Sequence, residues 1–346
     1  MASLAWLAIV VSACTRGVST GSSSTTIQPA DLYIAMPPVS DVRTLLGDDG
    51  WWAGPPMFGV RPLDVASMPF NQKFSVGENY VHVGSAEMFT VGYEVWNDTS
   101  AAKSHMTTVQ SALGTSAVAG PKVGDQAIYY GSQASGAAPF QTVTIVRVGQ
   151  VVALIGLDLK DGFPKVAQLG KIAAKVVSHL KDAMSGKVSS TPLSTPDAAL
   201  LPPANLDITM LGSTRISVEA ALVMIDAPSF DALAQTLRGS GVSDVVFGDY
   251  ALNSDTHMEV RAAVFTFSTA KNASDWVSGL RGSTPAGELG LYDDAHSWYI
   301  FPFVAGTSAA LLICHSTGDT EAASRACETP MSRVTSVWKL SLGSQS

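Results

Sequence analysis

The sequence predicts an α+β fold of two tandem, duplicated domains, each an antiparallel sheet packed with helices. Four observations support this prediction. The 346 residues exceed the usual size of one domain, and 46% of them are hydrophobic, enough for sizeable cores. A Pro/Ser/Thr-rich stretch, residues 186–206, divides the chain. On both sides of it, strand-like and helix-like segments follow in the same order.

The repeated order begins with a β-rich strand, a polar cap and a short helix, at residues 87–113 and again at 259–282. An acidic turn followed by aromatic residues comes next, in KVGDQAIYYG and in LGLYDDAHSWY. Two strands joined across a Gly turn then form a predicted hairpin, at VGQ in one half and AGT in the other. Identity between the halves is slight, so two unrelated α+β domains remain the alternative.

Helical periodicity is clearest just before the division. In residues 166–184 the apolar positions recur at steps of three and four, which indicates an amphipathic helix. The prolines that follow cannot continue a helix. A second predicted helix, Ser229–Arg238, ends at Gly239, and the chain closes with a helix over 330–342. We therefore expect a first domain at 30–185, a linker at 186–206 and a second domain at 207–342.

The N-terminus predicts a lipid anchor. Residues 4–13 are almost entirely apolar, too short to span a bilayer but typical of a signal peptide core. Small residues precede Cys14, as required for cleavage of a bacterial lipoprotein signal over 1–13, and Cys14 would then carry the lipid. Residues 14–29 are Ser/Thr-rich and suit a flexible tether. The first five residues lack the usual positive charge, so a chance apolar N-terminus stays open as the alternative.

The remaining cysteines, Cys314 and Cys327, follow a buried-strand pattern and precede the last helix. Outside the cytoplasm, this spacing predicts a disulfide that ties the strand to the helix. Two free buried thiols are the alternative. Because Cys14 would carry the lipid, two cysteines remain, and these two can pair with each other.

Several of these segments resemble those of a known group of proteins. The Val11–Cys14 lipobox, the tether, and the segments GDQAIYYG and VTIVRVGQVVALIGL resemble those of actinobacterial, notably mycobacterial, surface lipoproteins of unknown function. Some of these have domains similar to the photosystem II PsbP protein, or to the extracellular sensor domain of a mycobacterial serine/threonine kinase. The resemblance covers most of 30–342 and implies a non-enzymatic role in binding, sensing or scaffolding.

Motifs that would indicate catalysis or a cofactor are weak or missing. The sequence lacks GxSxG, HExxH, the Walker loop and GxGxxG. Ser100–Lys103 fits SxxK but lacks the partner motifs, so we interpret it as a helix N-terminus. Two acidic clusters could hold a divalent metal, although polar turns explain them as well: Asp249, Asp255, His257 and Glu259 form one, and Asp293, Asp294 and His296 the other. We predict no metal and no cofactor.

Paired tryptophans form the strongest candidate contact with a partner. Trp51 and Trp52 lie in a Gly/Pro-rich stretch and offer large apolar area at little conformational cost. They could equally close the end of a domain as core residues. Net charge is −8 and no basic run occurs, which argues against a nucleic-acid partner.

The function predicted from the sequence is non-enzymatic binding by a lipoprotein anchored through Cys14 on the outer face of the membrane. An unidentified envelope ligand or protein would be its partner. We expect the site in the cleft between the domains, since pockets favour such junctions. An envelope hydrolase with a non-standard site is the alternative, and a structural component that oligomerises is a third hypothesis.

Overall fold

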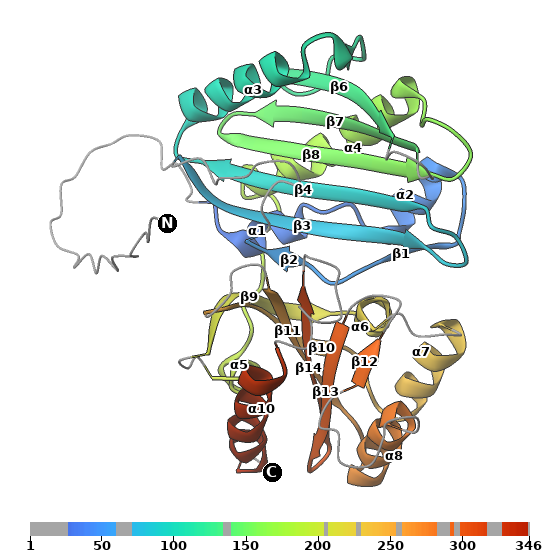
Figure 1. The fold of residues 1–346 in the computed structure, drawn as a ribbon, viewed down its shortest axis with the longest axis vertical. Helices are drawn as coiled ribbons and strands as arrows, with labels where there is room; N and C mark the ends of the chain where they lie inside the picture. The colour runs from blue at the N-terminus through green and yellow to red at the C-terminus, as the bar shows by residue number, and fades with distance from the viewer. Residues whose placement is uncertain are drawn as a thin grey trace, which may run out of the picture.

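The structure is a computed structural model, and it describes residues 27–59, 71–133, 140–203, 207–225, 230–253, 258–281, 291–293, 298–316 and 327–344. Its strands form two antiparallel sheets, one from each half of the chain. Helices pack on the faces of both sheets (Figure 1). The predicted α+β fold with two domains is therefore confirmed.

The first domain builds an eight-stranded sheet from the residues described, in the order β1-β3-β4-β8-β7-β6-β5, with β2 also paired to β3. Helices α1, α2 and α4 cover one face of this sheet and α3 covers the other. The elements are α1 (Pro29–Ile34), α2 (Val39–Leu46), β1 (Trp51–Ala53), β2 (Met57–Phe58), β3 (Gln72–His82), β4 (Met88–Trp96), α3 (Thr99–Leu113), η1 (Gly114–Ser116), β5 (Ala117–Val118), β6 (Gln126–Gln133), β7 (Phe140–Val148), β8 (Val151–Leu159) and α4 (Val166–Met184).

The second domain builds a six-stranded sheet from its described residues, in the order β12-β13-β14-β11-β10-β9. Helices α6, α7 and α8 lie on one side of it, and α5 and α10 on the other. The elements are α5 (Thr195–Ala199), β9 (Ile208–Ile216), α6 (Val218–Met224), α7 (Phe230–Gly239), β10 (Val245–Leu252), β11 (Met258–Thr266), α8 (Ala270–Arg281), β12 (Leu291–Asp293), β13 (Trp298–Ala305), β14 (Ser308–Ser316) and α10 (Glu328–Gly343).

The two sheets share one topology, which supports the predicted duplication. The first has the central order β3-β4-β8-β7-β6 and the second has β10-β11-β14-β13-β12, with strands in the same chain order. A helix follows the second strand of each set and another follows the last strand. The β7–β8 and β13–β14 hairpins turn at Gly149 and Gly306, whose φ angles are 58° and 57°, a conformation that favours glycine.

The predicted helices form where the apolar periodicity places them. Helix α4 buries the expected stripe, which includes Leu169, Ile172 and Val176. Helix α7 begins one residue later than predicted and buries Ala234 and Leu237. The SxxK residues lie in the first turns of α3, where the Asp98 carboxylate accepts a 2.8 Å hydrogen bond from the Ala101 N–H. Ser100–Lys103 is thus a capped helix N-terminus.

Much of the predicted linker at 186–206 packs on the second domain. It contains α5, and Leu201 is buried against the second sheet. The indole N–H of Trp338 in α10 donates to the Leu200 carbonyl at 2.7 Å. The Tyr250 hydroxyl of β10 donates to the Pro202 carbonyl at 3.2 Å. We call residues 193–203 the strap, because they cross the sheet face beside α10.

The domains meet through a shared hydrophobic core, and Phe58 lies at its centre. A Cβ on Gly212 of β9 would come within 2.4 Å of the Phe58 ring, so only glycine allows this approach. The Phe58 N–H also donates across the junction to the Asp249 carboxylate at 2.6 Å. Around it α1 contacts β9, α6 contacts β1, and β2 contacts β10. Packed side chains thus fill this part of the junction.

We expect Phe58→Ala to lower the free energy of unfolding by about 3–5 kcal/mol, because it removes a buried ring that no neighbour can replace. It should also uncouple the domains, so that calorimetry resolves two transitions instead of one. Phe163→Ala is the matched control, because its ring is 51% exposed, and it should cost under about 1 kcal/mol. Equal effects of the two substitutions would contradict this assignment.

Candidate functional site

The structure joins Cys314 and Cys327 in a disulfide, as the sequence predicted. Their Cα atoms lie 6.2 Å apart. Cys314 lies in β14, and Cys327 immediately precedes α10. The bond therefore ties a central strand to the last helix. Cys14 lies outside the described residues, so its predicted lipidation stays a prediction.

The two candidate tryptophans occupy different environments. Trp51 is only 2% exposed and packs edge-on against the His82 ring, with centroids 5.3 Å apart. Its carbonyl accepts a 2.9 Å hydrogen bond from Arg43 Nε. The Arg43 guanidinium then lies 4.3 Å from the centre of the half-buried Trp52 ring. Trp51 is therefore packed as a core residue, which was the alternative to a partner contact. The Trp52 ring is covered by a cation–π contact with Arg43.

The first acidic cluster is only partly described. Asp255 and His257 lie outside the described residues, as do Asp294 and His296 of the second cluster, and the side chain of Asp293 is not described. Asp249 and Glu259 lie on adjacent strands, β10 and β11, on the face toward the junction. Among the described side chains no group of three His, Cys, Asp or Glu is placed to hold a metal ion.

Asp249 belongs to the domain junction. It lies opposite Gly212 on one side and Arg261 on the other, and all three are neighbours across the sheet. Burial raises the pKa of Asp249 to about 7, although the positive charge of Arg261 lowers it. Arg261 also pairs with Glu259 at 3.0 Å. Of these groups, Asp249 makes the bond that crosses the junction, by accepting from the Phe58 N–H.

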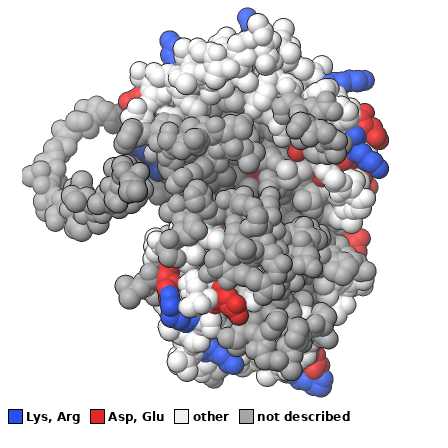
Figure 2. All heavy atoms as spheres, viewed as in Figure 1, with Lys and Arg blue, Asp and Glu red and all other residues white. Residues whose placement is uncertain are grey.

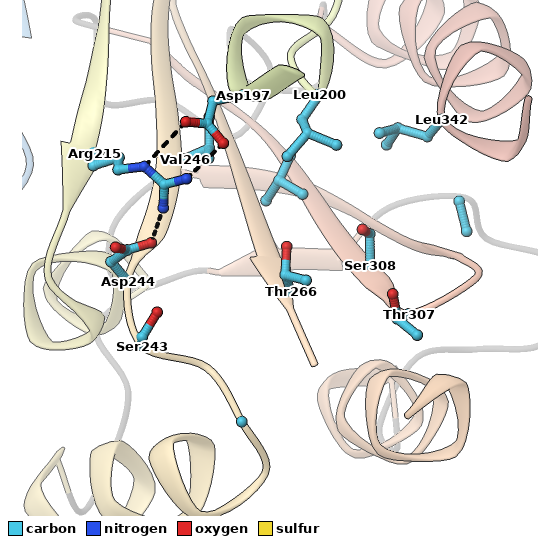
Figure 3. Close-up of a pocket in the computed structure, with 13 residues that line it drawn as sticks. Asp197, Leu200, Arg215, Ser243, Asp244, Val246, Thr266, Thr307, Ser308 and Leu342 are labelled. Atoms are coloured by element: carbon cyan, nitrogen blue, oxygen red, sulfur yellow. Dashed lines mark hydrogen bonds and ion pairs between the residues drawn. The ribbon is translucent and has the colours of Figure 1, made fainter. Parts of the chain in front are cut away.

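A cavity of about 480 Å³, drawn in Figure 3, lies elsewhere. It is at the end of the second sheet that points away from the first domain (Figure 1). The cavity therefore does not lie in the cleft between the domains, where we expected the binding site. It opens between the strap, the C-terminal end of α10 and the β13–β14 hairpin. Its volume is within the range of small-molecule pockets.

One wall of the cavity is ionic. Arg215, at the end of β9, donates to Asp197 of the strap through Nε at 3.3 Å and through Nη2 at 2.5 Å. Its Nη1 donates to Asp244, just before β10. The hydrogen bonds from Arg215 and Ser194 lower the pKa of Asp197, and the bond to Asp197 raises that of Arg215. One guanidinium and two carboxyl groups thus meet at this wall, with a formal net charge of −1.

The rest of the lining combines hydroxyls with aliphatic side chains. Val246 and Val264 form an apolar floor on the sheet face, while Leu200 and Leu342 come from the strap and from α10. The hydroxyl groups belong to Ser243, Thr266, Thr307 and Ser308, which lie on the opposite rim from Leu200 (Figure 3). Such a lining can both donate and accept hydrogen bonds beside an apolar surface.

No catalytic or binding motif of the sequence marks this cavity. Apart from the three charged residues, its members are ordinary Ser, Thr, Gly, Ala, Val and Leu residues, and the lining is spread from 197 to 342. One signal was present: Asp197 sits in a stretch predicted to be a linker, where a Ser-x-x-Asp pattern marks a capped helix. A helix inside a linker suggests that the segment packs on something.

Charged side chains on the face drawn in Figure 2 are scattered, with both signs mixed along the rim. Within the described residues, no helix combines the length and the apolar character needed to cross a membrane.

Comparisons with known proteins give a distant structural likeness. No family model matches the chain, and no curated protein matches it either. Among solved structures, it is similar to the extracellular domain of PknH from Mycobacterium tuberculosis, with 14% sequence identity and a TM-score of 0.38. The match covers 46% of this chain and 100% of that domain.

Replacing Arg215 tests whether the ionic wall holds the strap in place. We expect Arg215→Gln to speed hydrogen exchange of residues 195–203 several-fold, because Asp197 loses the guanidinium that ties it to β9. The loss of global stability should stay near or below about 1 kcal/mol, since the pair is partly exposed. Arg333→Gln is the control: it breaks a similar pair with Asp207 outside the cavity. Equal loosening of the strap in both variants would contradict this role.

Proposed function

We propose that this chain is a lipid-anchored extracytoplasmic protein that binds a small ligand, without catalysis, in the cavity beside the strap. The cavity is the observation that supports binding: it has a suitable volume, an apolar floor and convergent polar groups. The Cys314–Cys327 disulfide supports an oxidising compartment. The apolar segment before Cys14 supports export and anchoring.

The cavity's chemistry favours a neutral, polyhydroxylated ligand such as a small carbohydrate. Asp197 and Asp244 flank Arg215, so an anion would meet two carboxylates on its way to the guanidinium. A cation would meet Arg215 itself. A sugar hydroxyl can donate to a carboxylate and accept from a guanidinium or a Ser/Thr hydroxyl at the same time. The C–H face of a sugar ring suits the Val246 and Val264 floor.

A hydrolase in this cavity has less support. Among the residues that the structure describes, the cavity lining includes no His, Cys or Lys, and its two carboxylates already pair with Arg215. A hydroxyl nucleophile needs an adjacent base within hydrogen-bond reach. The non-enzymatic role is therefore the better supported of the two.

Anchoring depends on one thiol, so Cys14→Ala should abolish it. We expect the wild-type chain, produced in an actinobacterial host, to incorporate labelled palmitate and to sediment with membranes. The variant should lose the label and appear in the soluble fraction. Cys314→Ala combined with Cys327→Ala is the control, and this variant should keep the label. A palmitate-free wild-type chain would refute the anchor.

Binding can be tested by saturation-transfer NMR with glucose, glucuronate and glucosamine, which share a ring and differ in charge, and with neutral disaccharides. We expect signal from the neutral sugars and the weakest signal from glucuronate. Ala305→Trp should fill the cavity and abolish the signal, because Ala305 lines it. Ala112→Trp, on the exposed side of α3, is the control and should bind normally. Binding that survives Ala305→Trp would place the site elsewhere.

A further inference from the structure

Helix α1 is held at the domain junction by two tyrosine hydroxyls. The Tyr80 hydroxyl of β3 lies 2.6 Å from the Pro37 carbonyl oxygen, just after the helix. The Tyr93 hydroxyl of β4 donates to the Ala35 carbonyl at 2.9 Å. The same helix contacts α4 of its own domain and β9 of the other. Its position therefore affects both domains.

Proton counting around Tyr80 shows that one more hydrogen is needed. Its hydroxyl lies within hydrogen-bond distance of two oxygens, the Pro37 carbonyl and the Glu78 carboxyl. A carbonyl and an ionised carboxylate only accept, while a tyrosine hydroxyl has a single hydrogen to donate. Both contacts are satisfied only if Glu78 is protonated and donates to the Tyr80 oxygen. Tyr80 then donates to Pro37.

The surroundings of Glu78 favour the protonated form. Its side chain lies on β3, beneath α1, and only 5% of the residue is exposed. Burial raises its pKa to about 8, and the hydrogen bond with Tyr80 opposes this only in part. The nearby titratable groups are tyrosines: Tyr33 on α1, Tyr80 on β3 and Tyr93 on β4. Burial, followed by the proximity of Glu78, raises the pKa of all three.

Charged groups on the other elements around α1 are engaged elsewhere. On α4, Lys175 and His179 pair with Asp41 of α2. On α1 itself, Asp31 accepts from the Gln28 N–H and the Ser190 hydroxyl. Across the junction, Asp249 faces Arg261 and the Phe58 N–H. On β9, Arg215 is bound by Asp197 and Asp244.

We propose that the Glu78 carboxyl proton is a lock that fixes the end of α1 to the first sheet at the domain junction, and that its loss releases the helix. An ionised carboxylate is the stronger acceptor and takes the single Tyr80 hydrogen. The Pro37 carbonyl then loses its donor, and α1 loses one of its two hydroxyl ties. A rise in pH would thus loosen the helix at the junction of the two domains. This proposal does not depend on lipidation or on the cavity.

The sign of the pH effect follows from the direction of the shift. The folded-state pKa of Glu78 lies above its ordinary value of 4.5. The stabilisation is therefore complete below about pH 4.5 and is lost as pH rises towards 8. Each pH unit in that window should increase the opening equilibrium of α1 up to about tenfold. Above pH 8 the effect should level off.

Hydrogen exchange measured by mass spectrometry on the full chain tests this lock between pH 5 and pH 9. After correction for intrinsic rates, protection of residues 30–37 should fall by up to about tenfold per pH unit to pH 8. Glu78→Gln should abolish this slope, because a glutamine amide donates to Tyr80 at every pH. Glu94→Gln is the matched control: this buried acid of β4 faces α3 on the other side of the sheet, and burial raises its pKa to about 7.

A slope present in the wild type, absent in Glu78→Gln and kept in Glu94→Gln supports the lock. Three outcomes would overturn the lock. They are a slope in Glu78→Gln equal to that of the wild type, a slope lost in Glu94→Gln but kept in Glu78→Gln, and a wild-type protection that does not change with pH. If Glu78→Gln fails to fold, infrared spectra of the wild type and Tyr80→Phe decide. A buried carboxylic acid band at pH 6.5 that shifts when the Tyr80 hydroxyl is removed supports the lock, and no such band overturns it.

Discussion

The contact of Phe58 with Gly212 and Asp249 is the interaction on which the rest of the architecture depends. It places one ring and one backbone N–H of the first domain on the second sheet. Because β9 has a glycine there, the two backbones approach closely enough for α1 to reach β9 and for α6 to reach β1. The apolar faces on both sides then merge into one core. Without this contact each domain would expose an apolar face to water.

Buried acids gather around that junction. Asp249 and Glu78 are both buried near the elements that join the domains, and burial raises the pKa of each. A buried carboxyl costs free energy unless it is neutral or hydrogen-bonded. Both are hydrogen-bonded, Asp249 to Phe58 and Glu78 to Tyr80. Because each carboxyl bonds to a specific partner, these groups favour one arrangement of the junction over shifted ones.

The same topology is used differently in the two halves. The first sheet contributes its α4 face to the shared core, whereas the second contributes its α8 face. The face of the second sheet beneath α10 is therefore left to α10 and the strap. These two elements do not cover the end of the sheet where β13 turns into β14, and the cavity lies there. The two sheets share a topology but use different faces in the shared core, and the proposed binding site results from this difference.

Local pattern was enough to predict the α+β class, the repeated order, helix α4, both Gly hairpins and the Cys314–Cys327 bond, because periodicity, turn residues and cysteine spacing act over short stretches. Only the tertiary structure decided which faces meet. It buried Trp51 in the first domain, packed the strap on the second and brought Arg215 between Asp197 and Asp244. It also placed Glu78 beneath α1. These contacts join residues far apart in the chain, and their formation depends on the docking of two sheets, which no local pattern records.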